Sequence, residues 1–584
     1  MHHINRDLHS RRAGEREDNM KKRFCLKPIS ILLTVILMFG TLAASLYAFA
    51  DDDSVTFTVG TDMHIENTLT ELEINYPESE LYFQASGSGN LYDQAASLTK
   101  KFLNDSADEG ASFILIAGDL TRNGNEAQHR FTASLLSDFE SKTGIQVYVV
   151  PGNHDYFRST REEFKEYYHS FGYDSALAVH DSTASYTADV AGDYRLIAVD
   201  SNDPGNDGDG ITASLLNWIE EQANAAARDG KKIIYMMHHP LLEHLYMGKL
   251  LMKDFIVRGS ERIAEKFTRW GIEYVFTGHE HGNDIASFTG SNGKKVYDIL
   301  TTALSSYPLE YRRVTLSEGG ADIKMKKIGE CDTSSLIPGY TSAQREMLET
   351  DYEGYAYGIF RYSVEKKILR YTSPDFIKNK LKTGGGALSN QIDILFNAVN
   401  DALNMPIYNS GDGAVSIEKL AKSKGVTIPR SDYGSLIELA SALVANHYYG
   451  DENLPSASNT EAEIFIKGVN TGLEYILSRA GRENLNLLLE IIGTQSPLDT
   501  NELGLLFRAV GSEKENSYAV AEKLLYPLTD KFLIDSDVSD RDVFIPGQGS
   551  PQPRGLSAFA AFINKISEFI KRLFSFIFPL QNRM

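Results

Sequence analysis

Short apolar runs alternate with amphipathic helical patterns along residues 54–300. This alternation is typical of α/β architecture, in which helices separate the strands. Ligands of open α/β sheets bind beyond the carboxyl ends of the strands, so the residues that follow each run are candidates for a site. The expected strands are Val55–Val59, Phe113–Ala117, Val147–Val150, Leu196–Val199, Ile233–Met237 and Tyr274–Phe276.

Helical spacing dominates the second half of the chain. From about residue 387 to 535 apolar residues recur three and four apart, for example at Ile392, Leu395 and Phe396. This pattern predicts a mainly helical accessory domain over 377–535, with these residues in its core. Residues 355–372 are interpreted as a β-hairpin that helps to complete a first domain over 51–376.

The N-terminal region carries a targeting pattern. Basic residues precede an apolar run from Ile29 to Tyr47, and Ala48-Phe49-Ala50 follows as a small-x-small cleavage site. This pattern predicts a signal peptide over 1–50 and a secreted protein. The alternative is a retained membrane anchor, because the run approaches the roughly 20 residues that span a bilayer. Cleavage leaves Cys331 as the sole cysteine and excludes an internal disulfide.

The C-terminal region is amphipathic. Residues 536–556 are rich in Asp, Ser, Gly and Pro and are expected to form a linker. Residues 557–579 place Phe and Ile on one helical face and Lys565, Lys571 and Arg572 on the other. Such a helix is typical of contact with a membrane surface, which is the favoured interpretation. The alternative is a helix that docks on the protein's own body.

Composition narrows the class of protein. The chain has 584 residues, of which 42% are hydrophobic and 10% aromatic, so it can bury more than one core and is not disordered. Its formal net charge of −21 argues against a nucleic-acid-binding surface, which would need a basic field.

Each expected strand is followed by polar residues. Asp and Asn offer oxygens and His offers nitrogens, a mixture that suits Mn, Fe or Zn better than calcium. Residues two apart on extended backbone point to the same side, so the ends of a D-x-H or H-x-H motif should approach a metal together. Glycines in these motifs let the backbone turn sharply. The motifs are Asp62-Met63-His64, Gly118-Asp119, Gly152-Asn153-His154-Asp155, Asp200-Ser201-Asn202, His238-His239-Pro240 and Gly278-His279-Glu280-His281.

This set of motifs resembles the calcineurin-like metallophosphoesterase superfamily, whose pattern is D-x-H, G-D, G-N-H-D/E, H and G-H-x-H. Every block is present in the family's order over roughly residues 54–330. The resemblance implies two face-to-face β-sheets flanked by helices. It also implies two divalent or trivalent ions, which activate a water near neutral pH and clamp the phosphate ester.

The resemblance also assigns roles to residues. His154 is expected to act as general acid or to stabilise the phosphoryl oxygens, and Asp155 to orient it or to cap the next segment. Arg122 and Asn123 are expected to contact phosphate, with a plain surface turn as the alternative. His239 is expected to reach substrate or to pack beneath the site. The implied ligands are Asp62, His64, Asp119 and His281 for one metal, and Asp119, Asn153, His238 and His279 for the other.

These features predict an exported metallophosphoesterase that acts on phosphate esters, with phosphodiesters favoured. A phosphomonoesterase or nucleotidase that scavenges phosphate is the alternative within the class, and a lipid phosphodiesterase is also open. A non-catalytic binding protein with the same fold would be expected to lack some ligands, and here every block is complete.

Overall fold

A computed structural model describes residues 54–66, 87–202, 210–245, 255–329, 342–383, 385–409, 411, 415–450, 455–456, 458–495, 517–534 and 539–548. The expected signal peptide over 1–50 and the amphipathic helix over 557–579 lie outside these residues. The strands are β1 Val55–Gly60, β2 Phe113–Ile116, β3 Gln146–Val149, β4 Ala178–Val179, β5 Tyr186–Asp189, β6 Tyr194–Val199, β7 Lys232–Met237, β8 Tyr274–Thr277, β9 Asp284–Thr289, β10 Lys295–Leu300, β11 Glu310–Ser317, β12 Gly320–Lys327 and β13 Val543–Pro546.

Helices separate many of these strands and fill most of the second half. Two short turns, η1 His154–Tyr156 and η2 His169–Tyr173, follow β3. The longer helices are α4 Ala95–Asp108, α5 Glu126–Thr143, α6 Arg161–Tyr167, α7 Ala213–Arg228, α9 Ser260–Trp270, α10 Ser342–Thr350, α11 Tyr352–Tyr371, α12 Pro374–Leu381, α13 Ala387–Asn404, α14 Ile417–Ser423, α15 Leu436–Tyr449, α16 Thr460–Gln495 and α18 Ser517–Leu533.

The strands form two mixed sheets. The first has the order β13-β12-β11-β1-β2-β3, and the second the order β4-β5-β6-β7-β8-β10-β9. β1, β2 and β3 are parallel, as are β6, β7, β8 and β10. All six expected strands are present, which confirms the α/β prediction.

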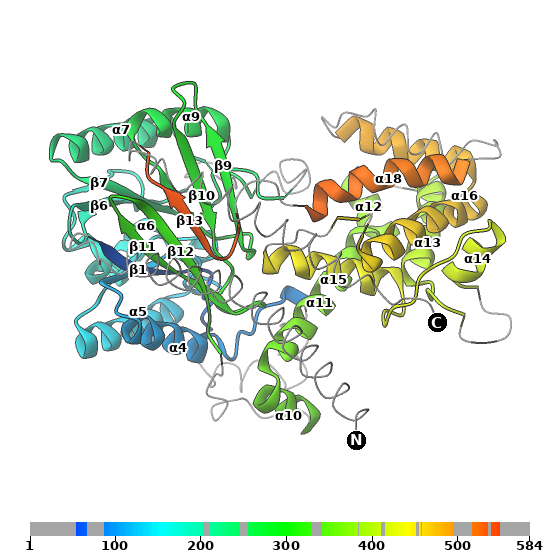
Figure 1. The fold of residues 1–584 in the computed structure, drawn as a ribbon, viewed down its shortest axis with the longest axis horizontal. Coiled ribbons are helices and arrows are strands. Elements are labelled where there is room, and N and C mark those ends of the chain that lie inside the picture. The colour runs from blue at the N-terminus through cyan, green and yellow to red at the C-terminus, as the bar shows by residue number, and fades with distance from the viewer. Residues whose placement is uncertain are drawn as a thin grey trace, which may run out of the picture. The chain divides into compact units, whose positions relative to one another are not determined.

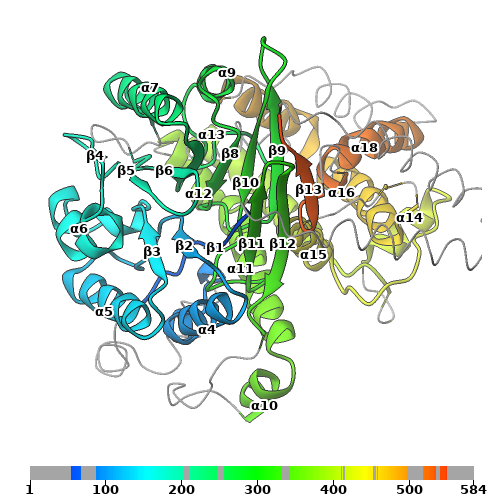
Figure 2. The same cartoon turned by 60° about the vertical axis from the view of Figure 1, so that its left-hand side comes forward.

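The two sheets pack face to face. Phe57 of β1 stacks on Phe113 of β2 with ring centroids 4.8 Å apart, and Phe276 of β8 meets Phe57 edge-on at 5.4 Å. Helices α4 and α5 cover the outer face of the first sheet, and α7 and α9 cover the outer face of the second (Figures 1 and 2). The architecture is the helix-flanked sandwich that the resemblance implies.

The hairpin expected over 355–372 is wrong, because these residues lie in α11. Tyr355, Ile359 and Phe360 are buried at helical spacing and pack with the core beneath the first sheet. The hairpin that does extend this sheet is formed by β11 and β12.

The linker expected over 536–556 contains a strand. β13 pairs antiparallel with β12, with Gly320 opposite Pro546, and Figure 2 shows it along the edge of the first sheet. In the order of the chain, the helical segment is therefore inserted between β12 and β13, two strands of the same sheet. It does not follow a finished domain. Ile392, Leu395 and Phe396 are buried, as expected. Among the described helices, none is both long and apolar enough to cross a membrane.

Candidate dinuclear metal centre

Backbone hydrogen bonds draw the strand ends together. After β1, the Asp62 N–H donates to Gly118 O over 3.0 Å, and the His64 N–H donates to Asp119 O over 2.9 Å. Between the sheets, the His279 N–H donates to Asp62 Oδ2 over 2.9 Å. The motifs that are far apart in sequence therefore meet at one edge of the sandwich, as the strand-end prediction requires.

The first group of predicted ligands is Asp62, His64 and His281. Their ligand atoms lie within 4.8 Å of one another. His281 Nε2 is 3.1 Å from Asp62 Oδ1 and 3.2 Å from His64 Nε2. Asp62 and His64 are buried, so the nitrogens and the carboxylate converge with little access to water.

The second group contains His238, His279 and Asn153. His238 Nε2 lies 3.1 Å from His279 Nδ1. Its Nδ1 lies 2.8 Å from Ala117 O, and a hydrogen bond from Nδ1–H to this carbonyl directs Nε2 into the site. The buried Oδ1 of Asn153 has no hydrogen-bond partner in the described part of the chain.

Asp119 lies between the two groups. Its Oδ2 is 3.8 Å from His64 Nε2 and 3.4 Å from His238 Nε2. A carboxylate in this position could bind an ion in each group, which agrees with the role expected of Asp119. The unpartnered Asn153 oxygen and the ring nitrogens that face one another carry lone pairs that bound cations would satisfy. The seven predicted ligands therefore fit a pair of transition-metal ions.

The protonation states of Asp62, Asp119 and His64 suit ligation. Burial alone would raise the pKa of Asp62, but His281 and His238 outweigh it and lower the pKa to about 2. Burial likewise opposes ionisation of Asp119, yet His238 and His154 hold its pKa well below the usual range. Burial, with His154, lowers the pKa of His64 to about 3. The carboxylates are therefore charged and His64 is neutral, as metal ligands must be. Burial lowers the pKa of His238, but Asp119 and Asp62 outweigh it and raise the pKa to about 10, so a metal ion would displace a proton from this ring.

The backbone at the ligands is not extended, contrary to the sequence interpretation. Five of the seven predicted ligands have left-handed backbone conformations, because the chain turns immediately after each strand. Such conformations are uncommon for residues other than glycine, and they concentrate at functional sites. The residues and their φ angles are Asp62 at 53°, His64 at 47°, Asp119 at 50°, His279 at 72° and His281 at 62°.

Two of the motif glycines are required by close packing. A Cβ on Gly152 would overlap the Asp119 carboxylate, and one on Gly278 would overlap the Thr61 hydroxyl and approach Asp62 Oδ2. The sequence analysis expected glycine to permit a turn beside the site. The structure shows that it also permits loops to touch ligands.

His154 lies beside the centre. Its backbone N–H donates to Asp119 Oδ1 over 2.8 Å, and its ring centroid is 4.7 Å from that of His64. Its Nδ1 is 2.7 Å from the carbonyl oxygen of Arg122. This carbonyl therefore orients the imidazole and leaves Nε2 for other contacts.

The prediction that Asp155 orients His154 is wrong. The buried Asp155 carboxylate accepts hydrogen bonds from the backbone N–H groups of Leu120, Thr121 and Gly152 and from the Thr121 hydroxyl, over 2.8–3.1 Å. These bonds tie the loop after Asp119 to the loop that carries Asn153 and His154. Asp155 is thus a positioning residue for two loops.

The proposed substrate contacts differ in their surroundings. The Arg122 guanidinium pairs with Glu66 over 2.8 Å and stacks on Tyr92, 4.0 Å from the ring centroid. The Asn123 N–H donates to the Gln128 side chain over 2.9 Å within a tight turn, the alternative weighed from the sequence. Their contact with phosphate stays a prediction.

His239 packs against the second group of ligands. Its ring is fully buried, its Nδ1 lies 2.8 Å from Ser201 Oγ, and its centroid is 4.4 Å from that of His279. One of its ring nitrogens lies within 4.8 Å of ligand atoms of His238 and His279, so its contact with substrate stays a prediction. Ser201, which holds it, lies in one of the strand-end motifs but received no role from the sequence.

Sequence reasoning also missed three aromatic residues around the centre. Phe157 lies against His154, Phe255 lies against His279, and Tyr92 packs under Arg122. Only Phe157 has a local signal, since it follows the G-N-H-D motif by two residues. The other two reach the site through tertiary packing.

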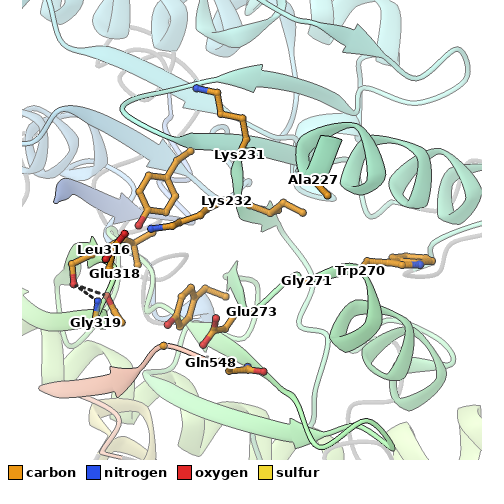
Figure 3. Close-up of a pocket in the computed structure, with 16 residues that line it drawn as sticks. Ala227, Lys231, Lys232, Trp270, Gly271, Glu273, Leu316, Glu318, Gly319 and Gln548 are labelled. Atoms are coloured by element: carbon orange, nitrogen blue, oxygen red, sulfur yellow. Dashed lines mark hydrogen bonds between the residues drawn. The ribbon is translucent and has the colours of Figure 1, made fainter. Parts of the chain in front are cut away.

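A cavity of about 770 Å³ lies away from this centre (Figure 3). It is lined by Tyr194, Lys232 and Tyr274, which begin β6, β7 and β8, and by residues of the β11–β12 turn. It therefore lies at the opposite ends of the strands, and no predicted site residue lines it.

The part of the chain that carries this site is similar in sequence to known phosphoesterases. Residues 55–283 match the family described as calcineurin-like phosphoesterase. A probable glycerophosphodiester phosphodiesterase of Arcobacter nitrofigilis is 26% identical over 174 residues, which are 29% of this chain and 56% of that protein. A probable cyclic nucleotide phosphodiesterase of Synechococcus is 23% identical over 35% of this chain and 72% of its own length.

A crystal structure of a dimetal phosphatase from Danio rerio is 12% identical and aligns with 47% of this chain and 97% of its own, with a TM-score of 0.34. The chain spans little more than half the length of the Arcobacter relative. Residues 55–283, with their complete set of motifs at one edge of a two-sheet sandwich, form a calcineurin-like phosphoesterase domain.

Proposed function

We propose that the protein is a metal-dependent hydrolase of phosphate esters that prefers phosphodiesters. The observation that carries this proposal is the placement of Asp119 between two groups of ligands, with His154 beside it. Two bound ions would supply Lewis-acid stabilisation of the phosphoryl oxygens and a water of lowered pKa.

The chain's own residues contribute positioning and proton transfer. The Arg122 carbonyl lies 2.7 Å from His154 Nδ1 and fixes the ring, which leaves Nε2 to meet the ester. Water loses one proton as its oxygen attacks phosphorus, the bond from phosphorus to one ester oxygen breaks, and His154 gives a proton to the leaving alkoxide. The proton released from the water then restores His154. The products are an alcohol and a phosphate monoester. Proton donation of this kind contributes about 10²–10⁴-fold to a rate.

The preference for diesters follows from the charge beside the centre. A monoester dianion gains more than a diester monoanion from an additional cation. The guanidinium predicted to meet the phosphate, Arg122, is neutralised by Glu66, and its side chain is only 14% exposed. The two relatives named as phosphodiesterases support the same choice.

Two variants test this function on bis(p-nitrophenyl) phosphate and p-nitrophenyl phosphate, with Mn, Zn and Fe. D119N should lose bound metal and hydrolysis together. H154A should keep the metal and lose at least about 10²-fold in kcat on a diester with an alkoxide leaving group, such as benzyl methyl phosphate, because p-nitrophenolate leaves without a proton. H169A removes an exposed histidine and serves as the control. A purified protein with no bound metal and no metal-stimulated hydrolysis would contradict the enzyme proposal, and full activity in H154A would contradict the role of His154. Faster hydrolysis of the monoester would select the phosphomonoesterase alternative.

Export and contact with a membrane surface are further proposals. They rest on the sequence patterns of residues 1–50 and 557–579. Secretion of a tagged chain, compared with one that lacks residues 20–50, tests export. Co-sedimentation of the mature chain with anionic vesicles, with and without residues 557–579, tests membrane contact.

A further inference from the structure

Two exposed phenylalanines lie on histidines of the metal centre. Phe157 is 57% exposed, and its ring centroid is 4.5 Å from that of His154. Phe255 is 37% exposed, and its ring centroid is 4.5 Å from that of His279. An exposed phenyl ring leaves apolar surface in water, and aromatic side chains beside a few convergent polar groups are typical of ligand sites.

The two rings lie at opposite ends of the ligand cluster. His154 lies next to His64, with ring centroids 4.7 Å apart. His279 lies next to His238, with ring centroids 4.9 Å apart. Asp119 lies between His64 and His238. An ester whose phosphorus is held near Asp119 therefore has an aromatic side chain toward each of its two alcohol groups.

We propose that Phe157 and Phe255 each provide a subsite for a planar aromatic group on one alcohol of the phosphodiester, so that nucleoside and aryl esters are preferred to aliphatic ones. The inference rests on the proposed phosphodiesterase function and names its substrate class. Phe157 contacts the residue that meets the leaving oxygen, so it receives the aromatic group of the leaving alcohol. Aromatic rings 4.5–7 Å apart attract one another in stacked and edge-on arrangements, which an aliphatic group cannot reproduce.

Two matched pairs of diesters test the subsite. Benzyl methyl phosphate and cyclohexylmethyl methyl phosphate differ only in the aromaticity of one alcohol. Adenosine 5′-(methyl phosphate) and ribose 5-(methyl phosphate) differ by the nucleobase. We expect the aromatic member of each pair to have a kcat/KM about 3- to 10-fold higher in the metal-loaded enzyme. A preference in one pair alone would identify whether the group is an aryl alcohol or a nucleobase.

Variants of Phe157 locate the effect. F157L keeps an apolar contact with His154 but removes the aromatic face, so the ratio of aromatic to aliphatic kcat/KM should fall to about 1. F157Y should keep the ratio. F131A removes a phenylalanine of α5 that is as exposed to solvent as Phe255. This variant should also keep the ratio.

The outcomes separate the subsite from the catalytic function. Hydrolysis of all four diesters with ratios near 1 in the wild type would overturn the aromatic subsite and leave the phosphodiesterase proposal intact. An unchanged preference in both F157L and F255L would overturn the assignment to these residues. No hydrolysis of any diester by the metal-loaded wild type would overturn both proposals.

Discussion

The backbone N–H of Asn283 donates to the carbonyl oxygen of Tyr448 over 3.2 Å, which joins the end of α15 to the loop that follows His281. The side-chain oxygen of Asn283 accepts from the N–H of Thr302 over 3.1 Å. The Thr302 hydroxyl in turn donates to His281 O over 2.6 Å. The helical segment therefore supports a predicted metal ligand through Asn283.

Replacing this asparagine should weaken the metal centre. N283A removes the acceptor for Thr302 and frees the loop that carries His281. Loss of a group that holds a ligand in place costs about 10–100-fold in metal affinity. Titration of the metal-free protein with Mn should show this loss. N292A, in the exposed β9–β10 turn, should bind Mn as the wild type does, and equal affinities for the two variants would contradict the support role.

A second substitution tests the assignment of Asp155 to loop positioning. D155N places an amide where three backbone N–H groups and a hydroxyl now donate to a carboxylate. At least one buried donor then lacks an acceptor, which costs about 1–3 kcal/mol. Urea unfolding should show this loss of stability, whereas D174N, at an exposed aspartate, should unfold as the wild type does. Unchanged stability with reduced kcat would instead restore the role in orienting His154.

Removal of the metals should also destabilise the fold. A ligand that binds only the folded state stabilises it, by about 2.7 kcal/mol at 100 times its Kd. Chelation should therefore lower the Tm, and added Mn should restore it. D119N removes the shared carboxylate and should show little response to either treatment. An equal response in D119N would place the stabilising ion elsewhere.

Much of this site could be predicted because it depends on local sequence. Apolar runs define the strands, and each of the seven ligands lies within about four residues of a strand's carboxyl end, so topology brings them to one edge. The roles of Asp155 and Arg122 could not be predicted, since a side chain's partner depends on which neighbouring loop it meets. Neither Ser201 with His239 nor Phe255 with His279 is adjacent in sequence.

The errors in the predicted fold also arise because distant contacts decide the local structure. Tyr355 to Tyr371 contains alternating apolar and polar residues, yet its buried positions follow the helical period because one face packs beneath the sheet. The strand β13 is short, and only its pairing with β12 distinguishes it from a linker. Its partner lies more than 200 residues earlier, beyond the reach of a local pattern.

The pH dependence of stability should include a contribution from Glu140. Burial raises the pKa of this side chain to about 7, although the N–H of Val147 opposes the shift. The folded state therefore keeps a proton that the unfolded chain, with a pKa near 4.5, has lost. Stability should fall as the pH rises from about 4.5 to 7, by on the order of 1 kcal/mol because the group is half-exposed and solvent screens it.

E140Q isolates this contribution. Glutamine keeps an oxygen for Val147 but does not titrate, so the difference in free energy of unfolding between variant and wild type should grow from pH 5 to pH 8. E162Q, at an exposed glutamate of α6, should give a constant difference. A constant difference for E140Q as well would show that Glu140 ionises alike in both states.

A buried ion pair fastens the returning strand to the sandwich. Arg541, two residues before β13, donates to both carboxylate oxygens of Glu310 over 2.6 and 2.9 Å and to Tyr449 O over 2.7 Å. Glu310 is fully buried, and the burial raises its pKa while Arg541 opposes the shift. The pair thus connects the start of β11, the end of α15 and the segment before β13.

Truncating one partner of this pair should cost more than removing both charges. R541A leaves the Glu310 carboxylate buried without its cation, a change worth about 3–5 kcal/mol. The double variant E310Q/R541A should recover part of that loss, because no uncompensated charge remains. The surface pair of Lys327 and Glu353, in which both side chains are about half exposed, provides the control, and K327A should cost less than about 1 kcal/mol. Urea unfolding of the four proteins measures these differences, and a cost for R541A no greater than that for K327A would mean that the returning strand is held by its backbone pairing with β12 alone.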